Sequence, residues 1–314
     1  MATKKSTKKA KQDKIPAVRY LRYELTNSGT PGNETSHYID LAKDLSAVNR
    51  RLMRQGRRYH VKKVTIVSSN TLNQGNRVSL STIPESWVSQ MAWKRGFEVF
   101  KEMNKRAMVN VAGSSIAGTW ADFKVYMSNG HRTGTVLEPK DNGGNNVSAG
   151  EWVYSQYITP DGTTTSDAFT AIMLGDHQGA AGSRSAVGLI KSYGESRATV
   201  QVGSPDVPGD LSDDPLINVF DYGTEIDEVL ERLELDNDVP PYDQANYPGD
   251  DGNMPKPLVV QDTTLVDGRS TVGGFHAMCG LIEIESKSAE PSDVYSVLVE
   301  LAPGKYRGIA AELI

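Results

Sequence analysis

Apolar and polar residues alternate along several short segments of this chain, and that pattern predicts β-strands. The segments are rich in β-branched and aromatic residues, and clusters of Gly, Pro, Asn and Asp separate them. Strands are predicted at residues 18–25, 61–67, 120–127, 152–158, 168–174, 275–285 and 294–301. Most of the chain is therefore expected to fold as β-structure.

A spacing of three or four residues between apolar positions predicts fewer helices. The longest covers residues 86–106, where Trp87, Trp93 and Phe97 belong to one apolar face and Pro84 precedes the start. Shorter helices are predicted at 36–55 and 227–235, and residues 185–193 fit either a helix or a strand. Because strands and helices do not alternate regularly, the expected architecture is an antiparallel sandwich or barrel.

The composition is that of an ordinary globular protein. The 314 residues are 38% hydrophobic and 23% charged. No apolar run approaches the ~20 residues that cross a bilayer, and no apolar segment of a secretory signal follows the first lysines, so we expect no membrane insertion. The single cysteine, Cys279, forms no internal disulfide, and no Cys/His spacing predicts a zinc site or another cofactor.

Charge is distributed very unevenly along the chain. Residues 1–63 contain 16 Lys and Arg against five Asp and Glu, whereas the other 251 residues contain 18 against 34. The overall net charge of −5 therefore describes neither part. Such asymmetry is typical of a basic arm, attached to a solvated body, that binds nucleic acid or a membrane surface.

Residues 1–15 are predicted to be a disordered basic arm. Ala is the largest apolar side chain between residues 2 and 14, so this segment has nothing to bury. Its lysines are expected to neutralise phosphates without sequence preference, because the arm has no aromatic side chain for base stacking. A solubilising tail or a nuclear localisation signal is the alternative. The predicted nucleic-acid-binding lysines are Lys4, Lys5, Lys8, Lys9, Lys11 and Lys14.

A second basic cluster contains only arginines, whose planar guanidinium groups suit bidentate phosphate contacts. On a helix, Arg50, Arg54 and Arg57 would share one face, directed with the arm toward one surface. A solvated or subunit-contacting face is an equally good interpretation. The cluster consists of Arg50, Arg51, Arg54, Arg57 and Arg58.

An acidic, proline-rich stretch at about 205–262 is predicted to be a surface insertion. It contains 16 acidic and two basic residues. Its carboxylates would repel phosphate, so we expect it to lie away from any bound nucleic acid. Five of its aspartates, at positions 210, 213, 214, 250 and 251, would suit a hard cation at a subunit contact if they met there.

Candidates for catalysis are few. His276 and Cys279 are three residues apart in a predicted strand, which directs them to opposite faces. Asp176 and His177 are the other neighbouring acid–base pair, and the glycine-rich turns lack the context of a phosphate loop. We therefore predict a protein that is not an enzyme.

Several sequence stretches resemble the capsid proteins of small circular Rep-encoding single-stranded DNA viruses. They are PESWV with WKRGF at 84–97, VGLIKSY with SR at 187–197, residues 216–223, PPYD with NYPG at 240–249, and CGLI at 279–282. The resemblance spans most of the chain. It implies a viral jelly-roll β-sandwich of two antiparallel four-stranded sheets with helical insertions, formed by residues 16–314, and a basic arm that faces the genome.

On this basis we expect a structural protein of the virion that self-assembles into an icosahedral shell and packages single-stranded DNA. Its partners would be further copies of itself, the genome and a host surface receptor, and it would pass through the host cell, including the nucleus, during assembly. The alternatives are a nucleic-acid-binding protein that forms no shell, a β-sandwich hydrolase with carboxylates from the acidic stretch, and an adhesin or tail component of a larger phage.

Overall fold

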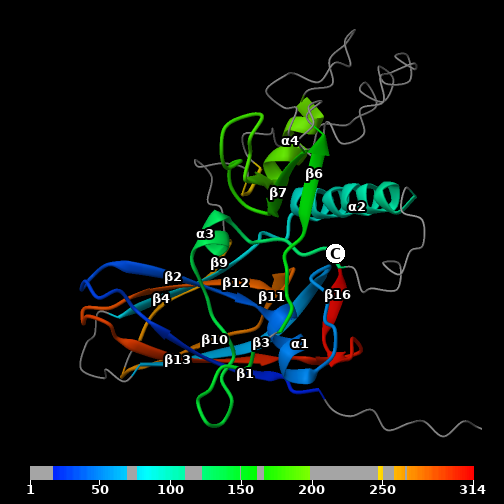
Figure 1. The fold of residues 1–314 in the computed structure, drawn as a ribbon. Coiled ribbons are helices and arrows are strands. Elements are labelled where there is room, and N and C mark those ends of the chain that lie inside the picture. Colours follow the sequence, from blue (N-terminus) through cyan, green and yellow to red (C-terminus); the bar gives the residue numbers. More distant parts are fainter. Residues whose placement is uncertain are drawn as a thin grey trace, which may run out of the picture.

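The computed structural model describes residues 17–68, 76–109, 122–148, 150–160, 166–198, 247–249, 258–265 and 267–314. Two sheets dominate it (Figure 1). The first sheet has the order β1-β13-β3-β10, β11 and β16 also pair with β3, and every pair is antiparallel. Its strands are β1 (Tyr20–Thr26), β3 (Arg57–Ser68), β10 (Arg269–Val272), β11 (Phe275–Met278), β13 (Val294–Leu301) and β16 (Ala311–Leu313).

The second sheet has the order β5-β2-β12-β4-β9 and is antiparallel apart from β5, which runs parallel to β2. A short hairpin of β14 and β15 follows the last long strand of the first sheet. The strands of the second sheet are β2 (Glu34–Asp40), β4 (Arg77–Thr82), β5 (Thr135–Val136), β9 (Leu258–Thr264) and β12 (Leu281–Lys287). Those of the hairpin are β14 (Pro303–Gly304) and β15 (Gly308–Ile309).

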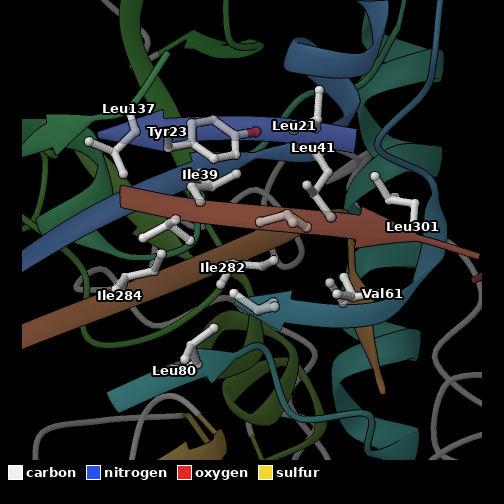
Figure 2. Close-up of a cluster of buried hydrophobic side chains, with 14 of the residues drawn as sticks. Leu21, Tyr23, Ile39, Leu41, Val61, Leu80, Leu137, Ile282, Ile284 and Leu301 are labelled. Atoms are coloured by element: carbon white, nitrogen blue, oxygen red, sulfur yellow. The ribbon is translucent and has the colours of Figure 1, made fainter. Parts of the chain in front are cut away.

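Apolar side chains from both sheets meet in one core, which makes the fold a β-sandwich (Figure 2). In β1, the side chains of Leu21, Tyr23 and Leu25 are buried, and those between them are exposed or half-buried. This period of two follows from the pleat, which directs successive side chains to opposite faces. Helix α1 (Leu41–Asn49) contributes Leu41 and Leu45 to the same core.

A smaller α/β layer is inserted between β4 and β9, above the sandwich in the view of Figure 1. Tyr157 and Phe169 of its sheet pack with Trp93 and Phe123 in a second apolar cluster, which Leu281 of β12 joins to the sandwich. The layer contains α2 (Trp87–Val109), α3 (Asn129–Thr133), α4 (Leu189–Ala198) and the sheet β6 (Gln156–Pro160), β7 (Ser166–Ile172) and β8 (Ala186–Gly188).

The mainly β architecture predicted from the alternating pattern is confirmed. The strand predicted at 294–301 coincides with β13, and those at 18–25 and 168–174 match β1 and β7 within two residues at each end. The long helix predicted at 86–106 is α2. Gly96 lies inside it, where the Tyr157 hydroxyl donates a hydrogen bond of 2.7 Å to the Gly96 carbonyl. A Cβ at this position would lie 3.1 Å from that hydroxyl oxygen, so the helix packs closely here.

The helix predicted at 36–55 is wrong in its first and last parts. Residues up to Asp40 form β2, which pairs with β12, and the helix begins only at Leu41. The Asp40 side chain accepts a hydrogen bond from the Lys43 backbone N–H at 3.1 Å and so caps the helix. Helical spacing alone could not reveal this boundary, because the partner strand lies more than 200 residues further along the chain.

Three other predicted strands differ from the structure. Residues 122–125 form no strand, because the N–H groups of Lys124 and Val125 bond to the side chains of Ser155 and Gln55. The segment at 152–158 becomes a strand only from Gln156. The segment at 275–285 is two strands, β11 and β12, separated by a turn at Cys279 and Gly280 in which both residues have positive φ. Residues 185–193 contain both a strand, β8, and the start of α4.

Several predictions concern residues outside the described ranges. These are the arm at 1–15, the helix at 227–235 and almost all of the acidic stretch at 205–262, apart from 247–249 and the start of β9. Among the described helices, none is long and apolar enough to cross a membrane.

Candidate nucleic-acid interface

The described chain begins at Ala17, between the end of α1 and the β14–β15 hairpin. The Val18 N–H donates to Asn49 Oδ1 at 2.8 Å, and Asn49 Nδ2 donates to the Val18 carbonyl at 3.1 Å. On the other side, a Cβ added to Gly308 would lie 2.8 Å from the Ala17 Cβ. These contacts determine where a basic arm of residues 1–15 would leave the sandwich.

The arginine cluster does not lie on one helix, so the predicted shared face of Arg50, Arg54 and Arg57 is wrong. Helix α1 ends at Asn49, Arg50 adopts the left-handed conformation with φ of 50°, and β3 begins at Arg57. The loop between them folds back on α1, because Met53 is buried and its N–H donates to Ser46 Oγ at 2.8 Å. The arginines are therefore spread over a helix end, a loop and a strand.

Arg54, Arg57 and Arg58 contact other side chains of the protein. Arg54 pairs with Asp122 at 3.1 Å, and Arg58 pairs with Glu312 at 3.0 Å. The Arg57 guanidinium lies over the ring of Tyr306, 3.6 Å from its centre. Their charges are thus partly used in holding the loop, the inserted layer and the C-terminal hairpin against β3.

Gln55 anchors the loop between α1 and β3, which carries part of the arginine cluster. Its Nε2 donates to Asp40 Oδ2 at 2.8 Å, and its Oε1 accepts from the Val125 N–H at 2.7 Å. Asp40 also accepts from Tyr154 at 3.0 Å and Trp152 at 3.2 Å, so one buried carboxylate joins α1, the loop and the inserted layer. Burial raises the pKa of Asp40, and the hydrogen bonds it accepts oppose that rise.

Other cations not selected from the sequence lie near the start of the described chain. Arg19 donates to the Leu301 carbonyl at 3.4 Å, and Arg307 lies 5.9 Å from the Tyr306 ring centre, next to Gly308. They are single cations in the sequence, and only the tertiary fold brings them to the arginine cluster. Together with two members of the arginine cluster, these cations form a group that we call the basic rim: Arg19, Arg50, Arg57, Lys305 and Arg307.

The two sheets differ in charge. The strands of the first sheet carry six Lys or Arg against three Glu, whereas those of the second carry two against four exposed or half-buried Asp and Glu. On the second sheet the pKa of Glu285 is raised, first by burial and then by the carboxylates of Glu34 and Glu283. A polyanion would therefore be attracted to the side of the basic rim and repelled from the second sheet.

The candidate catalytic groups are not arranged for reaction chemistry. Cys279 is fully buried in a turn, which raises the pKa of its thiol well above the usual range, while His276 is exposed on β11. Both ring nitrogens of His177 are occupied, since Nδ1 accepts from the Gly188 N–H at 3.2 Å and Nε2 donates to Glu195 at 2.8 Å. Within the described ranges, no three His, Cys, Asp or Glu side chains are grouped to hold a metal ion.

No protein-family model, curated protein or solved structure matches this chain.

Proposed function

We propose that this protein is a capsid protein of a small circular single-stranded DNA virus, with a viral jelly-roll fold that assembles into an icosahedral shell around the genome. The order of strand pairing supports the fold in this proposal, and the charge distribution supports the function. Leaving out the inserted layer, eight successive strands can be counted: β1, β2, β3, β4, β9, β10 with β11, β12 and β13.

Within this set, the first strand pairs with the eighth, the second with the seventh, the third with the sixth and the fourth with the fifth. The first sheet therefore has the order 1-8-3-6 and the second 2-7-4-5. This nested pairing is what a double Greek key, or jelly roll, requires, and viral capsid domains are one of its main classes. Lectins and cupins share the architecture, so the fold alone does not select the function.

The charge distribution favours the capsid over those other classes. The arm lysines and the basic rim would meet the phosphates of packaged DNA on one side, and the acidic second sheet would face away from it. The interaction is electrostatic and sequence-independent, so it lowers the self-repulsion of the confined strand and weakens steeply with salt. Subunit contacts that are weak one by one become strong in a closed shell, where each copy makes several.

Sedimentation of the purified full-length protein tests this proposal. We expect a fast fraction with nucleic-acid absorbance, uniform closed particles by negative-stain microscopy, and DNA inside them that resists nuclease. Only slow species across a range of salt and protein concentrations, with and without added single-stranded DNA, would contradict the shell. Particles that contain no nucleic acid at any salt concentration would contradict the packaging role.

A nucleic-acid-binding protein that forms no shell is the second candidate. The observation that favours it is that neither the arm nor the basic rim needs a shell in order to bind DNA. It predicts salt-sensitive binding by monomers or small oligomers, so the same sedimentation experiment separates the two.

A further inference from the structure

A pocket of about 260 Å³ lies at the end of the first sheet, beside the basic rim. Strand β3 contributes Arg58 and His60, β11 contributes His276, and the hairpin and β16 contribute Lys305 and Glu312. Gly304 closes one wall, where a Cβ would come within 2.4–2.8 Å of Ala310. This volume is slightly below the range of about 300–1,000 Å³ that is typical of small-molecule pockets.

The pocket adjoins the place where the arm would leave the sandwich. Gly304 pairs with Gly308 across the hairpin, and Gly308 packs directly against Ala17. The pocket and the first described residue, Ala17, therefore lie at the same end of the sandwich.

The lining offers three kinds of contact to a nucleotide. His60 and His276 are cross-strand neighbours whose rings are 4.7 Å apart at 75°, and an imidazole ring can stack against a base. Lys305 is exposed and makes no ion pair with the residues that the structure describes, so it is available to a phosphate. Glu312 supplies a carboxylate with an exposed side chain, which accepts hydrogen bonds only.

Glu312 is the group that would discriminate between bases. Arg58 Nη2 holds Glu312 Oε2 at 3.0 Å and so orients the carboxylate at the edge of the pocket. An acceptor in this position pairs with an exocyclic amino group, such as N4 of cytosine. At the position of this amino group thymine carries the acceptor O4, so it would make an unfavourable acceptor–acceptor contact there.

We propose that this pocket binds one nucleotide of single-stranded DNA, with the base stacked on the histidine pair, its amino group on Glu312 and its phosphate on Lys305. The proposal rests on the proposed DNA-packaging function and adds to it a preference for amino-bearing bases. The basic arm cannot supply such a preference, because it binds the phosphate backbone alone.

The test is equilibrium binding of fluorescent oligo(dC) and oligo(dT) of equal length to the full-length protein over a series of salt concentrations. We expect oligo(dC) to bind about fivefold more tightly than oligo(dT). This ratio is the lower end of the discrimination expected from one good contact to a base. Glu312→Gln should abolish the preference, because an amide can donate to thymine as well as accept from cytosine. The matched control is Glu24→Gln, a half-buried glutamate on β1 that also pairs with an arginine and lies outside the pocket.

A phosphate contact has a different signature from a base contact. Lys305→Ala should weaken both oligonucleotides equally and reduce the slope of log K against log salt by about 0.7. His276→Ala should also weaken both, and His276→Phe should restore binding by keeping an aromatic ring. Competition with free dCMP distinguishes a pocket for a nucleotide within a DNA strand from a pocket for a free nucleotide. In the second case, dCMP at micromolar concentrations would displace oligo(dC) from the pocket.

The outcomes separate the pocket from the function on which it rests. Equal binding of oligo(dC) and oligo(dT) by the wild-type protein, or a preference that survives Glu312→Gln, overturns the pocket and leaves packaging by the arm intact. A protein that binds neither oligonucleotide at low salt contradicts the proposed function itself.

Discussion

The guanidinium group of Arg57 lies 3.6 Å above the ring centre of Tyr306. The same tyrosine accepts a hydrogen bond on its hydroxyl from the Arg54 N–H at 3.1 Å, and the Tyr59 hydroxyl donates to the Arg54 carbonyl at 2.8 Å. These contacts hold the C-terminal hairpin against the start of β3, and they place the basic rim and the pocket beside each other. Two arginines that could have met phosphate are thus also part of the scaffold.

Tyr306→Leu is therefore expected to destabilise the protein by about 1–3 kcal/mol, because the cation–π contact and the acceptor for Arg54 are both lost. Tyr306→Phe keeps the ring and removes only the hydroxyl, so it should cost about 1 kcal/mol. Chemical denaturation of the two variants beside wild type measures both values. If both variants had wild-type stability, the hairpin would be held by other contacts.

Deleting residues 2–14 should leave the fold intact but lower the nucleic-acid content of the particles. The deletion removes six lysines. If all six meet phosphates, the slope of log K against log salt for single-stranded DNA should fall by about 4, at ~0.7 per contact. Replacing the same lysines by glutamine keeps the length of the arm and separates charge from chain length. Full nucleic-acid content after the deletion would show that the arm does not package DNA.

Arg50→Asn tests the basic rim without disturbing the backbone, because asparagine tolerates the left-handed conformation of position 50. We expect a moderate loss of DNA affinity and a salt slope lower by about 0.7, with unchanged thermal stability. Lys287→Gln, which removes a cation from the acidic second sheet, is the control and should leave binding nearly unchanged. Equal effects of the two substitutions would show that binding depends on net charge and not on the basic rim.

Asp44 makes the stability of the protein depend on pH. It is fully buried, and burial, its largest influence, raises its pKa to about 8 from 3.8, while its Oδ2 accepts from the Tyr23 hydroxyl at 2.6 Å. The folded state therefore keeps a proton that the unfolded chain loses near pH 4. Stability from this group is complete below that pH and decreases as the pH rises toward 8.

Denaturation at pH 6.5 and 8.5 should accordingly show a loss of stability in the wild type that is smaller in Asp44→Asn. Both proteins share the other titrating groups, including His131, whose pKa burial lowers to about 3 from 6.5, so the difference between their pH responses reports on Asp44. An identical pH response in both proteins would show that Asp44 is ionised in the folded state at neutral pH.

Gln55→Leu should cost about 2–4 kcal/mol, because it leaves Asp40 short of a donor and the Val125 N–H without an acceptor in a buried region. Since Gln55 anchors the loop that carries Arg54, the variant should also lose DNA affinity. Gln90→Leu, a half-buried glutamine on α2, is the control for the change of side chain. Stability equal to that of the control would contradict the role of Gln55 as an anchor.

Much of the fold follows from local pattern. The alternation along β1 and β13 is a direct consequence of the pleat, and the apolar face of α2 follows from 3.6 residues per turn, so these elements were predictable from the sequence. The concentration of cations before residue 64 is likewise a property of the sequence and predicts an electrostatic partner. What these patterns determine are the elements and the signs of charge.

The tertiary structure alone decided how the elements pair and which arginines have partners. Arg54 and Tyr306 are 252 positions apart, and β2 ends where α1 begins only because β12 supplies its hydrogen bonds. Local propensity carries no information on such distant partners, since the free energy of a pair depends on what the whole chain brings together. For the same reason the pocket between β3, β11 and the C-terminal hairpin has no local signature: its walls come from separate segments that the pairing of β11 and β16 with β3 places side by side.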